Sequence, residues 1–268
     1  MADGEKRSVL GILVNAIDRK GAVATIIDSA ACGRGLSVSA LAVHGIMTGV
    51  QDSEHKYRLN HLDVVVPDGQ PVRWALNLLH GTSLPDRVCG PDLMLDICAA
   101  AAERGLPVYL YGSRPETLLR LTARLARRFP DLIIAGSRPS RFRCLTAGEK
   151  AEVIDDIRRS GAAIVFVGLG CPRQEVWAYE YRQALDTPII AVGAAFDYHA
   201  GLLKRAPASM QRAGLEWLYR FLQEPRRLWQ RYLVLNPIYV TLLGVQSVRP
   251  RKFDVNAATP PTRELMYG

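Results

Sequence analysis

Short apolar runs alternate along the chain with longer segments in which hydrophobic residues recur every three or four positions. The runs are rich in valine, isoleucine and leucine and show little alternation with polar residues, as in strands buried on both faces of a parallel sheet. We expect strands at residues 8–14, 36–43, 62–66, 108–111, 132–135, 163–167 and 189–192.

The segments between these runs carry the signals that start and stop helices. Proline begins segments 71–80 and 115–128, and glycine follows segments 71–80 and 92–104. Thr146 and Glu149 form a capping-box pattern ahead of another helix. Strands and helices that alternate at this spacing predict an α/β fold, with a mostly parallel, Rossmann-like sheet and helices on both faces.

The pattern changes after residue 201, where arginines interleaved with tryptophan and tyrosine replace the alternation of strands and helices. We therefore expect an α/β catalytic domain at residues 1–201, a basic and aromatic helical appendage at 202–246 and a flexible tail at 247–268. The appendage fits a nucleic-acid surface, a helix lying on a membrane, or a terminal helix packed on the domain. Its tryptophans beside Arg226 and Arg227 favour the membrane.

Composition narrows the class of protein. With 49% hydrophobic and 22% charged residues among 268, the chain has the balance of a folded protein. Its formal net charge of +8 predicts an anionic partner, either a phosphate compound, a nucleic acid or a lipid surface. The 5 cysteines lack a C-x-x-C pair, which indicates neither a disulfide framework nor a zinc site and fits a reducing cytoplasm. The apolar runs are too short for a signal peptide or a membrane span, so we expect any membrane contact to be peripheral.

Glycine-containing loops follow four of the expected strands, at residues 67–71, 112–115, 168–175 and 193–197. In open α/β sheets, ligands bind beyond the carboxyl ends of the strands, and bare backbone amides there suit a diphosphate. A single glycine at a tight turn is more often only structural, but four such loops at one edge favour a site. The third glycine of a dinucleotide motif would fall on Arg173, so a Rossmann oxidoreductase is disfavoured.

Asp68 has the strongest claim to chemistry, because a carboxylate at a strand end could remove a proton from an attacking hydroxyl. The alternative is an Asx turn or helix cap ahead of the next helix. Asp197 has similar standing, with a capped turn as its alternative. The sequence contains no H-E-x-x-H, G-x-S-x-G, P-loop or D-x-D motif. Phosphate chemistry would then rely on backbone amides and on cations such as Arg87 and Arg114.

Several of these segments together resemble the bacterial WecG/TagA/CpsF glycosyltransferases over roughly residues 8–240. The resemblance is carried, in family order, by residues 67–69, 87–93, 108–113, 167–175, 193–197, 205–207 and 214–220. One departure concerns the family's Thr-x-Asn pair before the aspartate loop, where this chain has His44 in the segment 41–45.

The resemblance implies an inverting, metal-independent transfer of a sugar from a UDP-sugar to a polyprenyl-diphosphate-linked monosaccharide, without a cofactor. It implies that Asp68 is the general base. The residues implied to bind the nucleotide sugar are Gly69, Gln70, Arg87, Gly90, Tyr111, Gly112, Ser113, Gly168, Gly170, Pro172, Gln174, Glu175, Gly193, Phe196 and Asp197. Those implied to face the acceptor or the membrane are His44, Arg205, Arg212, Trp217, Arg220, Arg226, Arg227 and Arg231.

We therefore expect a cytoplasmic enzyme on the inner face of the plasma membrane, with no nucleic-acid partner and with homo-oligomerisation left open. The segment 71–74 resembles the exopolysaccharide branch of the family and favours UDP-glucose over UDP-N-acetylmannosamine. Two other classes stay open from the sequence: a nucleotide-cofactor oxidoreductase and a non-catalytic membrane or nucleic-acid adaptor.

Overall fold

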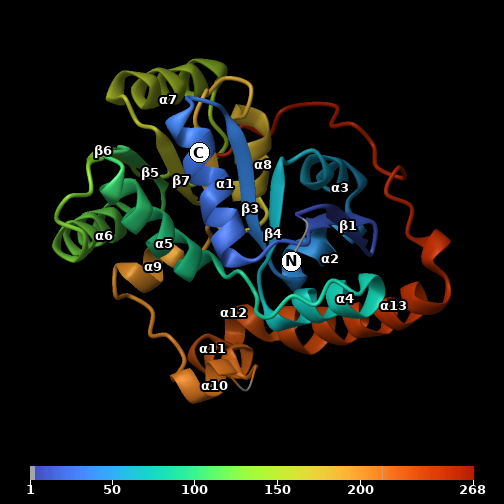
Figure 1. Ribbon diagram of the computed structural model, residues 1–268. Helices are drawn as coiled ribbons and strands as arrows, with labels where there is room; N and C mark the ends of the chain where they lie inside the picture. Colours follow the sequence, from blue (N-terminus) through green and yellow to red (C-terminus); the bar gives the residue numbers. More distant parts are fainter. Residues whose placement is uncertain (1–3, 213) are drawn as a thin grey trace.

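A computed structural model describes residues 4–212 and 214–268 and contains a six-stranded parallel sheet with helices on both faces (Figure 1). The strand order is β4-β3-β8-β7-β5-β6, and every neighbouring pair is parallel. The α/β, Rossmann-like fold predicted from the sequence is confirmed. The strands are β3 (Leu36–Leu41), β4 (Val64–Pro67), β5 (Val108–Gly112), β6 (Ile134–Arg138), β7 (Ile164–Gly168) and β8 (Pro188–Ala191).

The first apolar run differs from the expected single strand. It forms an antiparallel hairpin of β1 (Lys6–Val9) and β2 (Ile12–Asn15), outside the main sheet. Gly11 adopts a φ of +82° in the turn, a conformation that glycine reaches at little cost, so the chain reverses there. The Asn15 side chain accepts a hydrogen bond of 2.7 Å from the Val65 amide, which ties the hairpin to β4.

Two hydrophobic cores lie on opposite faces of the sheet, which explains why the strands lack polar alternation. On β7, Val165 and Val167 belong to one core, while Ile164 and Phe166 belong to the other. Successive side chains of a strand point to opposite faces, so both sets must be apolar when helices cover both faces.

Helices of the α/β domain pack on these two cores. One face is covered by α1 (Arg19–Ala31), α5 (Gly90–Glu103), α6 (Pro115–Arg128) and α9 (Ala195–His199). The other face carries α2 (Val43–Gln51), α3 (Ser53–Asn60), α4 (Gln70–His80), α7 (Ala147–Ser160) and α8 (Arg173–Tyr181). The capping box at the start of α7 is confirmed, because Thr146 and Glu149 exchange hydrogen bonds of 3.2 and 2.9 Å.

A chain of short helices follows the α/β domain and runs beneath one end of the sheet (Figure 1). It comprises α10 (Ala208–Arg212), α11 (Glu216–Gln223), α12 (Pro225–Trp229), the π-helical turn η1 (Gln230–Leu235), α13 (Asn236–Val248) and the 3-10 turn η2 (Pro250–Lys252). Among the described residues, no helix combines the length and the apolar character needed to cross a bilayer.

Residues 254–268, part of the expected flexible tail, make specific contacts across the domain, and we call them the C-terminal strap. The Glu54 carboxylate accepts a hydrogen bond of 3.2 Å from the Thr262 amide. The Glu180 carboxylate accepts hydrogen bonds of 2.7 and 2.9 Å from the amides of Leu265 and Met266. Carboxylates of α3 and α8 thus satisfy backbone donors of the strap, which holds it in one path.

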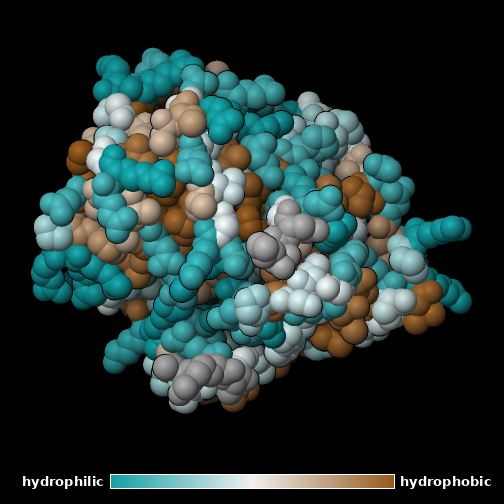
Figure 2. All heavy atoms as spheres, in the orientation of Figure 1, coloured by the Kyte–Doolittle hydropathy of each residue, from teal (hydrophilic) through white to brown (hydrophobic). Residues whose placement is uncertain are grey.

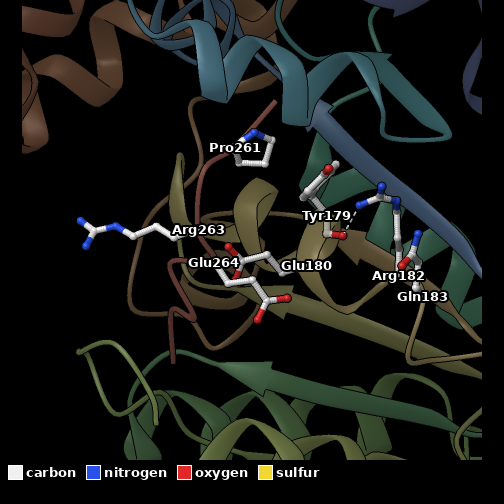
Figure 3. A pocket seen from close by; sticks show the side chains of 7 residues that line it. All are labelled: Tyr179, Glu180, Arg182, Gln183, Pro261, Arg263 and Glu264. Carbon is white, nitrogen blue, oxygen red and sulfur yellow. Dashed lines mark hydrogen bonds between the residues drawn. The ribbon is translucent and has the colours of Figure 1, made fainter. Parts of the chain in front are cut away.

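The end of the strap pairs with the loop between β6 and α7. Tyr267 forms an antiparallel bridge with Cys144, and the Met266 carbonyl accepts a hydrogen bond of 2.7 Å from the Leu145 amide. A cavity of about 310 Å³ remains between the strap and the C-terminal end of α8 (Figure 3). Its walls include both Glu180 and Arg263, so it favours neither sign of charge.

Candidate active site

Backbone hydrogen bonds fix Asp68 at the carboxyl end of β4. Its amide donates a hydrogen bond of 3.1 Å to the Leu41 carbonyl at the end of β3, and the Pro67 carbonyl accepts one of 2.9 Å from Val88. Gly69 follows with a φ of +88°, which separates the strand from α4. Asp68 therefore stands at the sheet edge where the ligands of open α/β folds bind.

The Asp68 carboxylate does not cap the next helix, contrary to the structural alternative raised by the sequence. The N-cap of α4 is Gly69, with no side-chain cap bond. The carboxylate instead accepts a hydrogen bond from the amide of Gly90, the first residue of α5. The partial positive charge at a helix N-terminus favours the ionised form of the Asp68 carboxylate, and the hydrogen bond orients the side chain toward α5.

Burial raises the pKa of Asp68 from 3.8 to about 6, and this effect exceeds the opposing influence of the positive charges of Arg87 and Arg220. The negative charge of Glu216 also raises it. At neutral pH the group is mostly ionised, yet it holds a proton more strongly than an ordinary aspartate. Those are the properties of a general base.

The C-terminal helices supply charges to the same place. The Arg87 guanidinium donates to the carboxylate of Glu216, the first residue of α11, and both side chains are largely buried. Arg220, also on α11, lies over the Tyr198 ring at 5.7 Å from its centroid. Residues predicted separately for the nucleotide sugar and for the acceptor therefore meet at Asp68.

Asp197 lies in α9, at the end of the site next to α12. Burial raises its pKa, against the influence of the positive charges of Arg227, Arg220 and Arg114. The positive charges of three guanidinium groups, from the loop after β5 and from the C-terminal helices, thus act on one carboxylate, and Arg227 also pairs with Glu224 at 2.9 Å. The alternative of a capped turn before Gly201 is present in the backbone: Gly201 has a φ of +74°, and the Asp197 carbonyl accepts a hydrogen bond of 2.9 Å from the Leu202 amide. The Asp197 carboxylate does not cap the start of α9, because the N-cap is Ala194 and has no side-chain cap bond.

Arg205 occupies a different position from the one expected for a residue that binds acceptor or membrane. One of its guanidinium nitrogens lies 2.8 Å from the Asp92 carboxylate, and a second nitrogen bonds to the other carboxylate oxygen. The Cys89 thiol also donates to Asp92, at 3.0 Å. Arg205 therefore ties the chain after the α/β domain to the first turn of α5, and its guanidinium is already engaged.

The buried side chains of Gln174 and Glu175 connect the loops after β7 and β8. The Glu175 carboxylate, 1% exposed, accepts hydrogen bonds from the Ser39 hydroxyl at 3.1 Å and the Gln174 amide group at 2.8 Å. The Gln174 side-chain oxygen accepts from the Gly170 amide at 3.1 Å, and the same side chain lies beside Gly193. Burial raises the pKa of Glu175. These contacts fix the positions of the loops after β7 and β8 relative to each other.

Several of the predicted glycines are needed for packing within the protein. A Cβ atom at Gly168 would lie 2.6 Å from the Phe196 ring, and one at Gly112 would lie 2.9 Å from the Gly168 backbone. A Cβ atom at Gly90 would lie 2.7 Å from the Val192 carbonyl oxygen. The close approach expected at these glycines is thus made by the protein's own loops.

Two predicted aromatic residues belong to the cores. Tyr111 is 1% exposed, and its ring stacks on Trp177 with centroids 4.8 Å apart. Phe196 is also 1% exposed, on the opposite face. The sequence placed both beside a strand end but could not show to which side each ring turns.

His44 and Arg231 come together although they are far apart in sequence. Burial and the positive charge of Arg231 lower the pKa of His44 to about 4, so its imidazole is neutral at pH 7. Within the part of the chain that the structure describes, its buried Nδ1 atom has no hydrogen-bond partner. A polar ligand group at this position could therefore bond to His44.

The remaining predicted residues lie around this edge with varied surroundings. Ser113 has a φ of 59° and its carbonyl accepts from Ser140, whereas Gln70 donates to Asp86. Pro172 follows a cis peptide bond. Arg226 is exposed and Trp217 is 39% exposed. The side chain of Arg212 lies outside the described part of the structure.

Sequence reasoning missed three residues of the site: Glu216, Tyr198 and Tyr232. The guanidinium of Arg220 lies over the Tyr198 ring, and the ring centroids of Tyr232 and Trp217 are 5.7 Å apart. The signal for Glu216 was its position as a rare acid in a basic segment. Among residues 4–212 and 214–268, no group of three or more histidines, cysteines and acids is arranged to hold a metal.

Comparison with protein families gives one match. The family model described as the glycosyl transferase WecG/TagA/CpsF family covers residues 7–253. The matched range includes the sheet, the helices through α13 and all the site residues above, and it ends before the C-terminal strap.

Proposed function

This chain belongs to the WecG/TagA/CpsF glycosyl transferase family, and from that premise we propose that it transfers a sugar from a UDP-sugar to a polyprenyl-diphosphate-linked monosaccharide. The family makes it a glycosyltransferase of polysaccharide biosynthesis. This membership decides against the oxidoreductase and the non-catalytic adaptor. We favour UDP-glucose as the donor, with UDP-N-acetylmannosamine next.

The observation that supports the proposal most strongly is the Asp68 carboxylate, with a pKa raised to about 6 at the rim of the sheet. An acceptor hydroxyl attacks the anomeric carbon while Asp68 takes its proton. The new carbon–oxygen bond forms as the bond to UDP breaks, and the electron pair leaves with UDP. One displacement inverts the anomeric centre and requires a single carboxylate base.

Charge on the departing diphosphate must be stabilised on the side opposite Asp68. Arg220, Arg227 and Arg114 surround this edge near Asp197, and backbone amides of the glycine loops add fixed dipoles. Arginine suits this role because its planar guanidinium binds phosphate oxygens in pairs. We propose that these groups take the place of a divalent metal.

We further propose that the enzyme lies on the inner face of the cytoplasmic membrane. Trp217 on α11 and Trp229 on α12 are 39% and 47% exposed, and Leu222 is 68% exposed. Hydrophobic residues also gather on the surface over α4 and α13 (Figure 2). Exposed tryptophans beside Arg226 and Arg227 suit an interface with anionic headgroups, where a lipid-linked acceptor would be met.

One assay tests the reaction. Purified protein is incubated with a panel of UDP-sugars and a short lipid-diphosphate monosaccharide, and products are identified by mass and anomeric configuration. We expect one added sugar with an inverted anomeric centre, formed at the same rate in EDTA. Retention of configuration, strict dependence on a divalent ion, or no product from any UDP-sugar would contradict the proposal.

A further inference from the structure

A second cavity, of about 460 Å³, lies between α5, α6 and α9, and of its lining residues Tyr198 also belongs to the candidate active site. Its wall carries Arg124, Arg127 and Arg128, three exposed arginines in the last part of α6. The guanidinium of Arg124 lies against the bare Cα of Gly201, where any Cβ atom would displace it. We call this space the arginine cavity.

Within residues 4–212 and 214–268, no acid lines the arginine cavity, and none of its three arginines forms an ion pair. His199, which lines the cavity, has its pKa lowered by burial and by the charges of Arg128 and Arg205, which favours its uncharged form. The acid that raises this pKa is Asp92, whose two carboxylate oxygens are both held by Arg205. The guanidinium groups of the cavity can therefore bind an anion from solution.

The lining and the position of the arginine cavity restrict the class of ligand that it can bind. Leu95 and Leu125 line it beside the arginines, so part of the surface is apolar. Tyr198 forms another wall, and Arg220 of the active site lies over the same Tyr198 ring. The cavity is therefore a neighbour of the reaction site, separated from Arg220 by one aromatic side chain.

We propose that the arginine cavity binds a phosphate-bearing anion, through the guanidinium groups of Arg124, Arg127 and Arg128. Guanidinium groups pair with phosphate oxygens in a bidentate manner, and an apolar floor admits the carbon skeleton attached to the phosphate. The phosphate belongs either to a phospholipid headgroup or to a free phosphate compound. This proposal does not depend on which sugar the enzyme transfers.

The test compares two variants of equal charge. The cavity variant is Arg124→Gln/Arg127→Gln/Arg128→Gln, and its control is Arg120→Gln/Arg158→Gln/Arg159→Gln. The control arginines are exposed as well but line no part of the cavity. Binding is measured by calorimetry with inorganic pyrophosphate, and by sedimentation with phosphatidylglycerol vesicles against phosphatidylcholine vesicles. Circular dichroism melting verifies that both variants fold.

We expect the cavity variant to bind one of these probes at least tenfold more weakly than the wild type, with the control within twofold. If the cavity variant loses binding only to phosphatidylglycerol vesicles, the ligand is a lipid headgroup. If it loses binding only to pyrophosphate, the ligand is a free phosphate compound. Equal losses in both variants would show a response to net charge alone and would overturn the proposal. Unchanged binding of both probes by the cavity variant would overturn it too.

Discussion

At the scale of single residues, the proposed function depends on the surroundings of one carboxylate, that of Asp68. Asp68 is a small acid between Pro67 and Gly69, and such a residue would usually titrate near 4. Burial raises its pKa, whereas the Gly90 amide and nearby arginines lower it again. The balance leaves an ionised base at neutral pH whose proton affinity exceeds that of a solvent-exposed aspartate.

Asp68→Asn should reduce kcat by at least about 100-fold while UDP-sugar binding persists, because the amide keeps the shape of the side chain and cannot accept the hydroxyl proton. In the wild type, kcat/KM should fall about tenfold per pH unit below a pKa of about 6, since protonation removes the base. Steady-state rates between pH 4.5 and 8 test both expectations. A variant as fast as the wild type would remove Asp68 from the mechanism.

Glu216→Gln should move the acidic limb of that pH profile to lower pH, by several tenths of a unit. The negative charge of Glu216 raises the pKa of Asp68, so its removal favours ionisation of Asp68 and also frees Arg87. Glu152→Gln is the matched control, because Glu152 is an exposed acid that pairs with Arg138 instead. A limb that stays in place, or moves to higher pH, would contradict this electrostatic account.

At the scale of elements, the C-terminal strap joins parts of the domain that are far apart in sequence. It bonds to Glu54 on α3, to Glu180 on α8 and to the loop that contains Cys144. Burial raises the pKa of Glu180, and the two strap amides compensate by donating to the carboxylate. The strap follows the residues that the family model matches, which end at residue 253.

Deletion of residues 254–268 should lower the free energy of unfolding by about 2–4 kcal/mol, because several part-buried hydrogen bonds are lost together, among them the two to the Glu180 carboxylate. Hydrogen exchange should quicken at the amides of Phe142 and Leu145, which bond to the strap. Lys150→Gln, which removes one ion pair to Glu264 at 2.7 Å, should cost less than about 1 kcal/mol. Urea unfolding measures both; equal stability of the deletion and the wild type would show that the strap contributes nothing.

At the scale of the whole molecule, the C-terminal helices bring basic residues and exposed apolar residues to the end of the sheet that holds Asp68. The C-terminal helices both close over the carboxylate through Glu216 and present Trp229 and Leu233 to solvent, 47% and 57% exposed. In the proposed function, catalysis and membrane contact occupy opposite sides of this layer of helices.

Trp229→Ser/Leu233→Ser should weaken binding to phosphatidylglycerol vesicles by about tenfold, because two large apolar side chains no longer enter the interface. Ile133→Ser is the control, since Ile133 is 50% exposed just before β6, away from the carboxyl ends of the strands. Binding of the wild type should also weaken with added salt. Vesicle sedimentation tests the expectation, which fails if the double variant binds like the control.

Local patterns in the sequence determined most of the secondary structure and placed the candidate base at a strand end. The capping box of Thr146 and Glu149, and the uninterrupted apolar run at β7, depend only on neighbours in sequence. The aspartate after β4 likewise had to stand at a strand end. Such features follow from backbone hydrogen bonding and side-chain periodicity, which act over a few residues.

Only the tertiary structure decided which distant groups meet. The engagement of Arg205 by Asp92 and the burial of Tyr111 against Trp177 follow from packing between separate elements. The raised pKa of Asp68 is of the same kind, because burial and charges from α11 produce it. Desolvation and charge interactions act through space, so a linear pattern does not contain them.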